Sequence, residues 1–241
     1  MELLTLKAYE LIKNTDVMIY ADSLVSNDIE GLVKKSCIVY KSSRMTLNEV
    51  LNVIQRHYND GLDICRVHSG DPSIYGAIDE QIKYFNEHSM EYEIIPGVSS
   101  VFAAASRIGE LTRPGLSQSL IITRVPVRTD YIENEDLSEL ARHKSTMAIL
   151  LSAARAREVT EKLINAGFSE NDRLIIAYKI SWPDEMIIET TVKDLEGDLF
   201  KNRISRQAII FAGGVISFHG GKSSNLYNEN FKHMFRAGKK S

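Results

Sequence analysis

The feature that most limits the fold is a regular alternation of short apolar runs and helical segments in the first hundred residues. Short, largely apolar runs at 17–20, 64–67 and 92–95 have the length and composition of buried strands. Segments 2–14, 46–58 and 73–86 repeat apolar residues at helical spacing, and Thr46 with Glu49 has the spacing of a capping box. Strands separated by helices predict an α/β fold with a mostly parallel sheet.

The pattern changes after Pro114 and Gly115. Five further strands are predicted close together, with one strong helix at 154–166 among them; the strands are 120–123, 147–151, 174–178, 186–188 and 207–212. This arrangement favours a second α/β domain with a mixed sheet. We therefore predict a first domain over 1–114, a second over 115–218 and a basic tail over 219–241.

The composition is that of an ordinary globular protein and excludes several classes. The chain has 241 residues and a net charge of −3, so it carries no electrostatic footprint for nucleic acid. No apolar stretch approaches the ~20 residues of a membrane span, and no signal peptide opens the chain. Cys37 and Cys65 lie in apolar runs and are expected to be buried, reduced thiols. We expect a cytoplasmic protein that binds neither membrane nor nucleic acid.

Residues 68–76, here called the first loop, read His-Ser-Gly-Asp-Pro-Ser-Ile-Tyr-Gly and follow a predicted strand. Gly70 allows a backbone to come close to a ligand, and Asp71 can cap a helix or accept a hydrogen bond. The carboxyl edge of a parallel sheet is where such folds bind ligands. An ordinary strand-to-helix turn explains the same residues equally well.

Residues 95–100, the second loop, read Ile-Pro-Gly-Val-Ser-Ser and also connect a predicted strand to a helix. Alone this motif is mostly structural, with Gly97 for a sharp turn and Ser99 or Ser100 as a helix cap. Because each loop follows a parallel strand, both are predicted to converge on one edge of the sheet. The sequence has no phosphate loop and no dinucleotide fingerprint, so a ligand with few phosphates, such as a nucleoside, is favoured.

Other candidate sites are weaker. The six histidines show no metal-ligand spacing with the cysteines, so we predict no metal site. Residues 115–119 do not form the elbow of a serine hydrolase. His68 is the one histidine with a possible functional position. The segment 178–185 contains Trp182 and is either a hairpin loop or the rim of a ligand site.

Eight segments in order carry a resemblance to a known family: 3–8, 20–25, 45–47, 68–77, 96–100, 116–118, 122–124 and 181–185. Residues 226–227 and 231–236 extend it into the tail. The chain resembles the tetrapyrrole methylases, and within them the enzymes that methylate precorrin-4 or cobalt-precorrin-4 at C11.

The resemblance implies two α/β domains with S-adenosylmethionine in the cleft between them, usually in a homodimer, and a role in cobalamin (and more broadly porphyrin) biosynthesis. The cofactor contacts that it implies are Gly70, Asp71, Ile74, Tyr75, Ser99, Ser100, Met147, Leu151, Ser152, Tyr178 and Ala208. A precorrin-type substrate carries many carboxylates, and the cations suited to pair with them are Arg113, Arg124, Lys179 and Arg44. No residue is identified as a catalytic base.

One departure from the family concerns the start of the chain. Family members begin with a strand and a glycine loop, and Met1 stands where that loop would end. We expect an open slot in the first sheet, bordered by 17–20 or 94–95, and a natural start that lies upstream. Two alternatives remain: a sister methylase acting at another macrocycle carbon, and an inactive cofactor-binding or assembly module.

Overall fold

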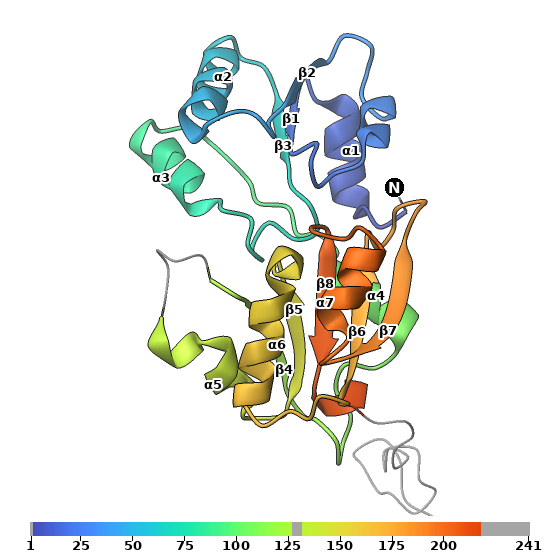
Figure 1. Ribbon diagram of the computed structural model, residues 1–241. Helices are drawn as coiled ribbons and strands as arrows, with labels where there is room; N and C mark the ends of the chain where they lie inside the picture. Colours follow the sequence, from blue (N-terminus) through green and yellow to red (C-terminus); the bar gives the residue numbers. More distant parts are fainter. Residues whose placement is uncertain (1, 127–131, 218–241) are drawn as a thin grey trace, which may run out of the picture. The chain divides into compact units, whose positions relative to one another are not determined.

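The computed structural model describes residues 2–126 and 132–217, which form two compact units (Figure 1). The first unit comprises Met1–Ala104 and Ile180–Pro183, and the second comprises Ala105–Lys179 with the described residues from Asp184 onward. The division falls inside helix α4 (Ser100–Ile108), whereas the sequence pattern places the domain boundary at 114–115. The predicted tail at 219–241 lies outside the described residues.

The first unit contains a parallel sheet of order β2-β1-β3, formed by β1 (Val17–Tyr20), β2 (Ile38–Lys41) and β3 (Ile64–Val67). Val17 lies opposite both Ile38 and Ile64, so β1 is the central strand. The predicted parallel sheet is confirmed, and β2 is a strand that the sequence pattern did not predict. Cys37 and Cys65 are free and only half-buried.

Strand β1 is buried on both faces, which explains its unbroken apolar sequence. Val17 and Ile19 belong to a cluster with residues of α2 (Leu47–Asn59) and α3 (Asp79–Glu87). Met18 and Tyr20 pack on the opposite face with Ile12 of α1 (Leu6–Asn14). Helices therefore cover both faces of the sheet at its central strand.

The capping box of α2 is confirmed. Thr46 Oγ1 accepts a hydrogen bond from the Glu49 N–H at 3.3 Å, and Glu49 Oε2 accepts one from the Thr46 N–H at 2.7 Å. These two bonds satisfy N–H groups that the helix itself leaves unpaired, and they define where α2 begins.

Two predictions for the first unit are wrong. The helix expected from Ser73 begins only at Asp79, because Tyr75 and Ala77 have φ angles of 54° and 49°, which no right-handed helix contains. The strand expected at 92–95 forms no strand pairing in the described chain. A strand needs a neighbouring strand for its N–H and C=O groups, and this segment has none.

An open edge of the sheet lies next to that segment. β3 pairs with β1 on one side, and among the described residues no strand pairs with its other side. A cavity of about 650 Å³ is lined both by residues of β3 and by 91–98. Ile94 and Ile95 are among the residues that line this cavity, and the residues of the central strand β1 are not.

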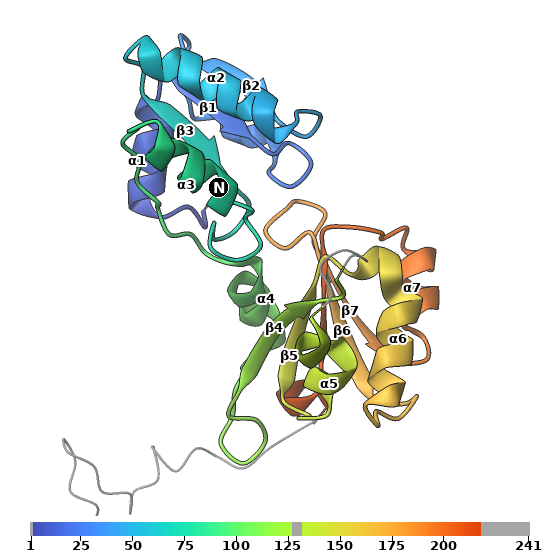
Figure 2. The same ribbon diagram turned by 90° about the vertical axis from the view of Figure 1, so that its left-hand side faces the viewer.

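The second unit contains a mixed sheet, as predicted (Figure 2). Its strand order is β4-β5-β8-β6-β7. Its strands are β4 (Leu120–Arg124), β5 (Thr146–Leu150), β6 (Arg173–Tyr178), β7 (Met186–Thr191) and β8 (Ala208–Ala212). β4 and β5 are parallel, whereas β8 is antiparallel to both β5 and β6. β4, β5 and β6 consequently end at the same edge.

Three helices cover one face of this sheet: α5 (Leu137–Ala141), α6 (Ala156–Asn165) and α7 (Leu195–Lys201). Their buried residues form one core cluster with alternate residues of the strands, including Leu163, Leu195, Ile149 and Ile176. Short 3-10 turns complete the elements at Asn27–Gly31, Glu133–Glu135, Ala153–Arg155 and Gly214–Ser217. Within the part of the chain that is described, no helix has the length and apolar character to span a bilayer.

Candidate functional site

The first and second loops are joined through the carboxylate of Asp71. Its Oδ2 accepts a hydrogen bond from the Gly97 N–H at 3.0 Å. Its Oδ1 accepts from the N–H of Ser73 at 2.9 Å and from the Ser73 hydroxyl at 2.5 Å. The Ser73 hydroxyl and the two N–H donors hold the pKa of Asp71 below its usual value, so the group is ionised at neutral pH.

The two loops also touch through their glycines. A Cβ atom on Gly97 would lie 2.1 Å from the Gly70 carbonyl oxygen, which leaves no room for any side chain. Gly70 has a φ of +67°, and a Cβ there would lie 3.4 Å from the Ser100 nitrogen. The two loops are therefore in direct contact, although the second loop does not follow a strand of the sheet as predicted.

The start of α4 supplies hydrogen-bond donors beside these loops. Within the described residues, the N–H groups of Val98, Ser99 and Ser100 have no hydrogen-bond partner. Ser99 is buried, and its hydroxyl accepts a bond from the Val101 N–H at 3.3 Å, so it caps the helix as predicted. Unpaired N–H groups at a helix start can bind a carboxylate or another acceptor of a ligand.

The aromatic ring of Tyr75 is exposed on a strained backbone. Its φ angle is 54°, and 42% of the residue is accessible to solvent. A bulky residue rarely adopts this conformation unless the surroundings or a function require it. Ile74 is half-buried, and its N–H donates to the Asp71 carbonyl at 3.1 Å. Among the predicted cofactor residues of the first unit, Gly70, Asp71, Ile74, Tyr75, Ser99 and Ser100 thus lie on two loops in contact.

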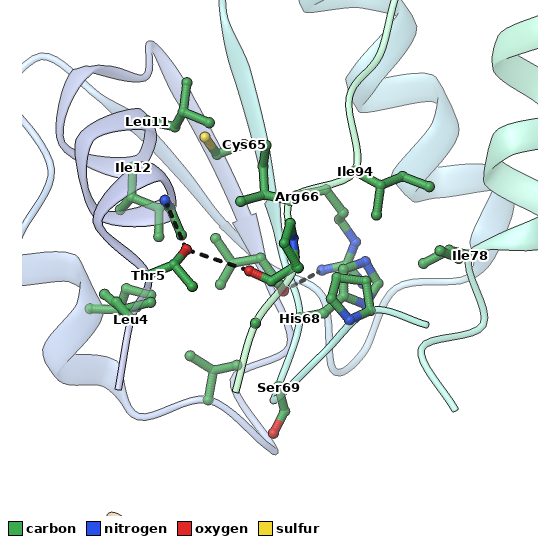
Figure 3. A pocket seen from close by; sticks show the side chains of 18 of the residues that line it. Leu4, Thr5, Leu11, Ile12, Cys65, Arg66, His68, Ser69, Ile78 and Ile94 are labelled. Atoms are coloured by element: carbon green, nitrogen blue, oxygen red, sulfur yellow. Dashed lines mark hydrogen bonds between the residues drawn. The ribbon is translucent and has the colours of Figure 1, made fainter. Parts of the chain in front are cut away.

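His68 and Arg66 lie side by side in the cavity at the β3 edge (Figure 3). Burial, and secondly the charge of Arg66, lower the pKa of His68 to about 4. Arg66 Nη1 donates to the carbonyls of Ile19 and Val67 at 3.3 Å each, while its Nε is buried without a partner in the described chain. His68 is therefore a neutral imidazole at neutral pH.

In the second unit, strained residues gather at the edge where β4, β5 and β6 end. Leu151 directly follows β5 with a φ of 53°, Lys179 follows β6 with 45°, and Gln207 precedes β8 with 57°. The Lys179 N–H donates to the Gln207 carbonyl at 2.9 Å, which joins two of these positions. Such strain persists where the surrounding structure imposes it, and it concentrates at functional sites. Leu151 is also 58% exposed, an unusual placement for an apolar side chain.

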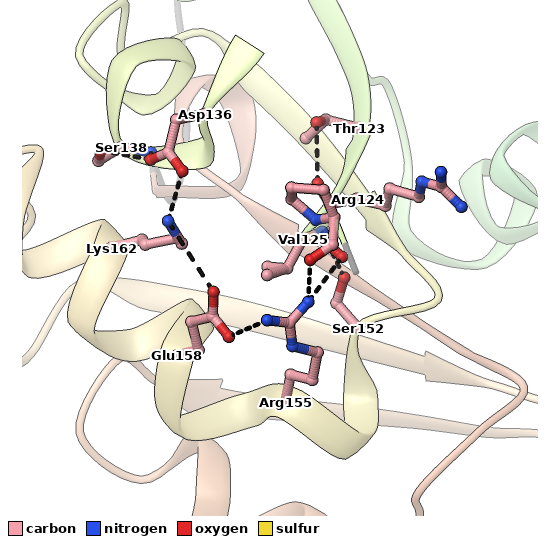
Figure 4. A network of polar contacts seen from close by, with 10 residues as sticks. Thr123, Arg124, Val125, Asp136, Ser138, Ser152, Arg155, Glu158 and Lys162 are labelled. Atoms are coloured by element: carbon pink, nitrogen blue, oxygen red, sulfur yellow. Dashed lines mark hydrogen bonds and ion pairs between the residues drawn. The ribbon is translucent and has the colours of Figure 1, made fainter. Parts of the chain in front are cut away.

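A polar network fixes the end of β4 at this edge (Figure 4). The buried Ser152 hydroxyl accepts from the Val125 N–H at 2.8 Å and donates to the Leu150 carbonyl at 2.7 Å. Arg155 donates to the carbonyls of Val125 and Pro126 and pairs with Glu158 at 2.5 Å. Behind it, Lys162 pairs with Glu158 and with Asp136, whose carboxylate also caps α5.

The remaining predicted cofactor residues of the second unit occupy different environments. Tyr178 ends β6 and Ala208 begins β8 directly opposite it, so both belong to the strained edge. Met147 is 0% exposed within the core cluster under the helices, and the structure does not bring it to the edge.

The predicted substrate cations have different local environments. Lys179 is paired with Asp184 at 2.6 Å, which raises the pKa of the lysine. Arg113 lies 3.6 Å from Glu110, and Arg124 ends β4 at the strained edge. Arg44 is exposed and forms no ion pair with any described residue. The described residues also hold no group of three or more side chains suited to a metal ion.

Sequence reasoning missed Gln207 and Arg155. No signal in the sequence marks either one, because a positive φ can be anticipated for glycine but not for glutamine or leucine. The partners of Arg155 are backbone carbonyls, whose positions depend on the folded sheet.

A family model described as "Tetrapyrrole (Corrin/Porphyrin) Methylases" matches residues 1–196. The chain belongs to the tetrapyrrole methylase family.

Relatives of this methylase cover almost its whole length. A cobalt-precorrin-4 C(11)-methyltransferase of Priestia megaterium is 43% identical over 100% of this chain and 95% of its own. One of the same name from Methanocaldococcus jannaschii is 42% identical over 98% and 91%. A precorrin-4 C(11)-methyltransferase of Pseudomonas aeruginosa is 36% identical over 98% and 94%.

Solved structures confirm the fold of this methylase. The X-ray structure of a cobalt precorrin-4 methyltransferase from cobalamin biosynthesis matches with a TM-score of 0.84 and 44% identity, covering 88% of this chain and 89% of that one. A uroporphyrin-III C-methyltransferase from Thermus thermophilus, complexed with S-adenosylhomocysteine, matches with a TM-score of 0.73 over 88% and 86%. Its 23% identity supports the fold alone.

Proposed function

We propose that this tetrapyrrole methylase transfers a methyl group from S-adenosylmethionine to C11 of cobalt-precorrin-4 in cobalamin biosynthesis. The observation that carries the proposal is the 43% identity to a cobalt-precorrin-4 C(11)-methyltransferase over 100% of this chain and 95% of the relative. Relatives named for the cobalt-containing substrate are 43% and 42% identical, against 36% for one named for the cobalt-free substrate. This difference favours the cobalt-containing macrocycle.

The residues at both edges suit S-adenosylmethionine. The ligand carries a carboxylate and hydroxyl groups, for which the unpaired N–H groups at 98–100 are matching donors. Gly70 and Gly97 allow the first loop to pack directly against the second loop, beside these donors. Exposed, strained Tyr75 offers apolar surface to the nucleoside. We accordingly propose Gly70, Ile74, Tyr75, Ser99, Ser100, Leu151, Ser152, Tyr178 and Ala208 as cofactor-site residues.

The chemistry needs little beyond binding and orientation from the protein. S-adenosylmethionine supplies an electrophilic methyl group, and the substrate supplies an electron-rich ring carbon. Alignment of two reactants can lower a barrier by about 7–11 kcal/mol. Arg113, Arg124 and Lys179 are proposed to pair with the carboxylates of the macrocycle and so orient its ring carbon.

A homodimer in the cytoplasm belongs to the same proposal. Two large apolar side chains, Leu6 of α1 and Phe200 of α7, are each 86% exposed and offer surface for contact between copies. Light scattering of the purified chain at several concentrations tests the dimer, and a constant monomer mass contradicts it.

The direct test uses the 241-residue chain, S-adenosylmethionine with a ¹³C-labelled methyl group, and either cobalt-precorrin-4 or precorrin-4. A new methyl resonance assigned to C11, formed faster with the cobalt-containing substrate, supports the proposal. Methylation at another carbon identifies a sister methylase. Binding of S-adenosylhomocysteine by calorimetry without turnover on either substrate identifies an inactive cofactor-binding module.

A further inference from the structure

We propose that Asp71 is a positioning residue, which holds the second loop against the first so that the start of α4 is fixed for cofactor binding. This inference deepens the proposed function and rests on it. It differs from a direct contact between Asp71 and the cofactor, because Asp71 would act through Gly97.

The hydrogen bonds of Asp71 support this role. Three donors already surround its two oxygens: the N–H and the hydroxyl of Ser73 on Oδ1, and the N–H of Gly97 on Oδ2. The Ser73 bonds fix the carboxylate within its own turn. The Gly97 bond is the one that reaches a segment 26 residues further along the chain.

The packing of the two loops shows why such a bond is needed. The carbonyl of Gly70 occupies the space where a Gly97 side chain would begin, so the two backbones are in direct contact. The two loops touch without forming the regular hydrogen-bond ladder of a sheet. The segment 92–96 has no strand partner among the described residues. The charge-assisted hydrogen bond that Asp71 accepts from Gly97 therefore holds the second loop in place, as strand pairing would in a sheet.

The location of Gly97 in turn determines where the N–H donors at the start of α4 lie. Val98, Ser99 and Ser100 directly follow Gly97, and their N–H groups are the ones without partners in the described chain. A shift of Gly97 moves all three donors together. Ser99, whose hydroxyl caps the helix, is buried and links the loop rigidly to α4.

The experiment compares five variants in the full chain by calorimetry with S-adenosylhomocysteine and by hydrogen exchange of the ligand-free protein. Asp71→Ala removes the acceptor, and Gly97→Ala forces the loops apart while Asp71 stays intact. The double variant combines both changes, and Asp71→Asn keeps an oxygen that can accept from Gly97. Ser73→Ala is the matched control, because it removes a donor to the same carboxylate and leaves the Gly97 bond.

We expect Asp71→Ala and Gly97→Ala each to weaken binding about 10- to 100-fold, with no further loss in the double variant, since both act on one contact. Asp71→Asn should recover most of the loss, and Ser73→Ala should bind within about threefold of wild type. In the ligand-free protein, Asp71→Ala should speed amide exchange at Val101, Phe102 and Ala103, whose N–H groups are hydrogen-bonded to Ser99 at the start of α4. Loss of a direct cofactor contact would not change this exchange.

Losses that multiply in the double variant, or unchanged exchange at Val101, Phe102 and Ala103 in folded Asp71→Ala, overturn the positioning role. If wild type fails to bind S-adenosylhomocysteine, the proposed function fails, and the exchange comparison still decides the link between Asp71 and Gly97. Should Asp71→Ala not fold, Asp71→Asn and Gly97→Ala provide the same comparison.

Discussion

The buried hydroxyl of Ser152 accepts a hydrogen bond from the Val125 N–H at 2.8 Å. The same hydroxyl donates to the Leu150 carbonyl, so one side chain joins the ends of two neighbouring parallel strands. Arg124 and Leu151, two proposed ligand contacts, are adjacent in sequence to these bonded groups. The two hydrogen bonds of Ser152 therefore stabilise the sheet and also fix the backbone beside the proposed ligand contacts.

Replacing Ser152 with Ala should lower the free energy of unfolding by about 1–3 kcal/mol, because the Val125 N–H is left buried without an acceptor. Urea denaturation measures the change. Ser119→Ala is the control, since that exposed hydroxyl has no hydrogen bond within the described residues. Equal urea midpoints for Ser152→Ala and wild type would contradict this prediction, because they would show that water replaces the hydroxyl as the partner of the Val125 N–H.

Leu151→Gly should weaken S-adenosylhomocysteine binding and leave the free energy of unfolding unchanged or raised by up to about 1 kcal/mol. The side chain is mostly exposed, and glycine relieves the strain of its positive φ angle. Leu151→Ala is the matched variant, which loses the side chain and keeps the strain. A large loss of stability in the glycine variant contradicts this account, since it would mean that Leu151 packs in the core.

Arg124→Gln and Arg113→Gln should raise the KM for the tetrapyrrole and change cofactor affinity little. Each variant removes a cation that is proposed to pair with a substrate carboxylate, an interaction worth about 1.5–3 kcal/mol when charge-assisted. Steady-state kinetics and calorimetry separate the two effects. Arg142→Gln, at an exposed arginine paired with Glu139, is the control. If both variants match Arg142→Gln, neither arginine contacts the substrate.

His68 should make the protein less stable as the pH falls from about 6.5 to 4. Its folded-state pKa of about 4 lies below the unfolded value of 6.5, so between these values the unfolded state binds the proton and the folded state does not. Between pH 7 and 5, wild type should lose about 1–2 kcal/mol more than His68→Gln, with allowance for partial exposure. Urea denaturation at both pH values gives the comparison, and parallel losses in the two proteins would refute the assignment.

Much of the fold could be predicted because its signals are local. Strands β1 and β3 are predicted with their observed ends because both are short, largely apolar runs, and β1 is buried on both faces. The capping box likewise placed the start of α2 from two residues. The helix expected from Ser73 failed because Tyr75 and Ala77 adopt positive φ angles that their side chains do not announce.

The sequence by itself determined most of the alternation of strands and helices, the two glycine loops at 68–76 and 95–100, and the family resemblance that those residues carry. Tertiary structure decided what depends on distant partners. Residues 92–95 form no strand in the described chain, because a strand needs a neighbouring strand to pair with. The hydrogen bond from the Gly97 N–H to Asp71 Oδ2, at 3.0 Å, forms because folding brings the two loops together. Tertiary structure also placed Met147 in the core and strained Leu151 at the surface, since neighbouring strands and helices impose burial and backbone conformation together.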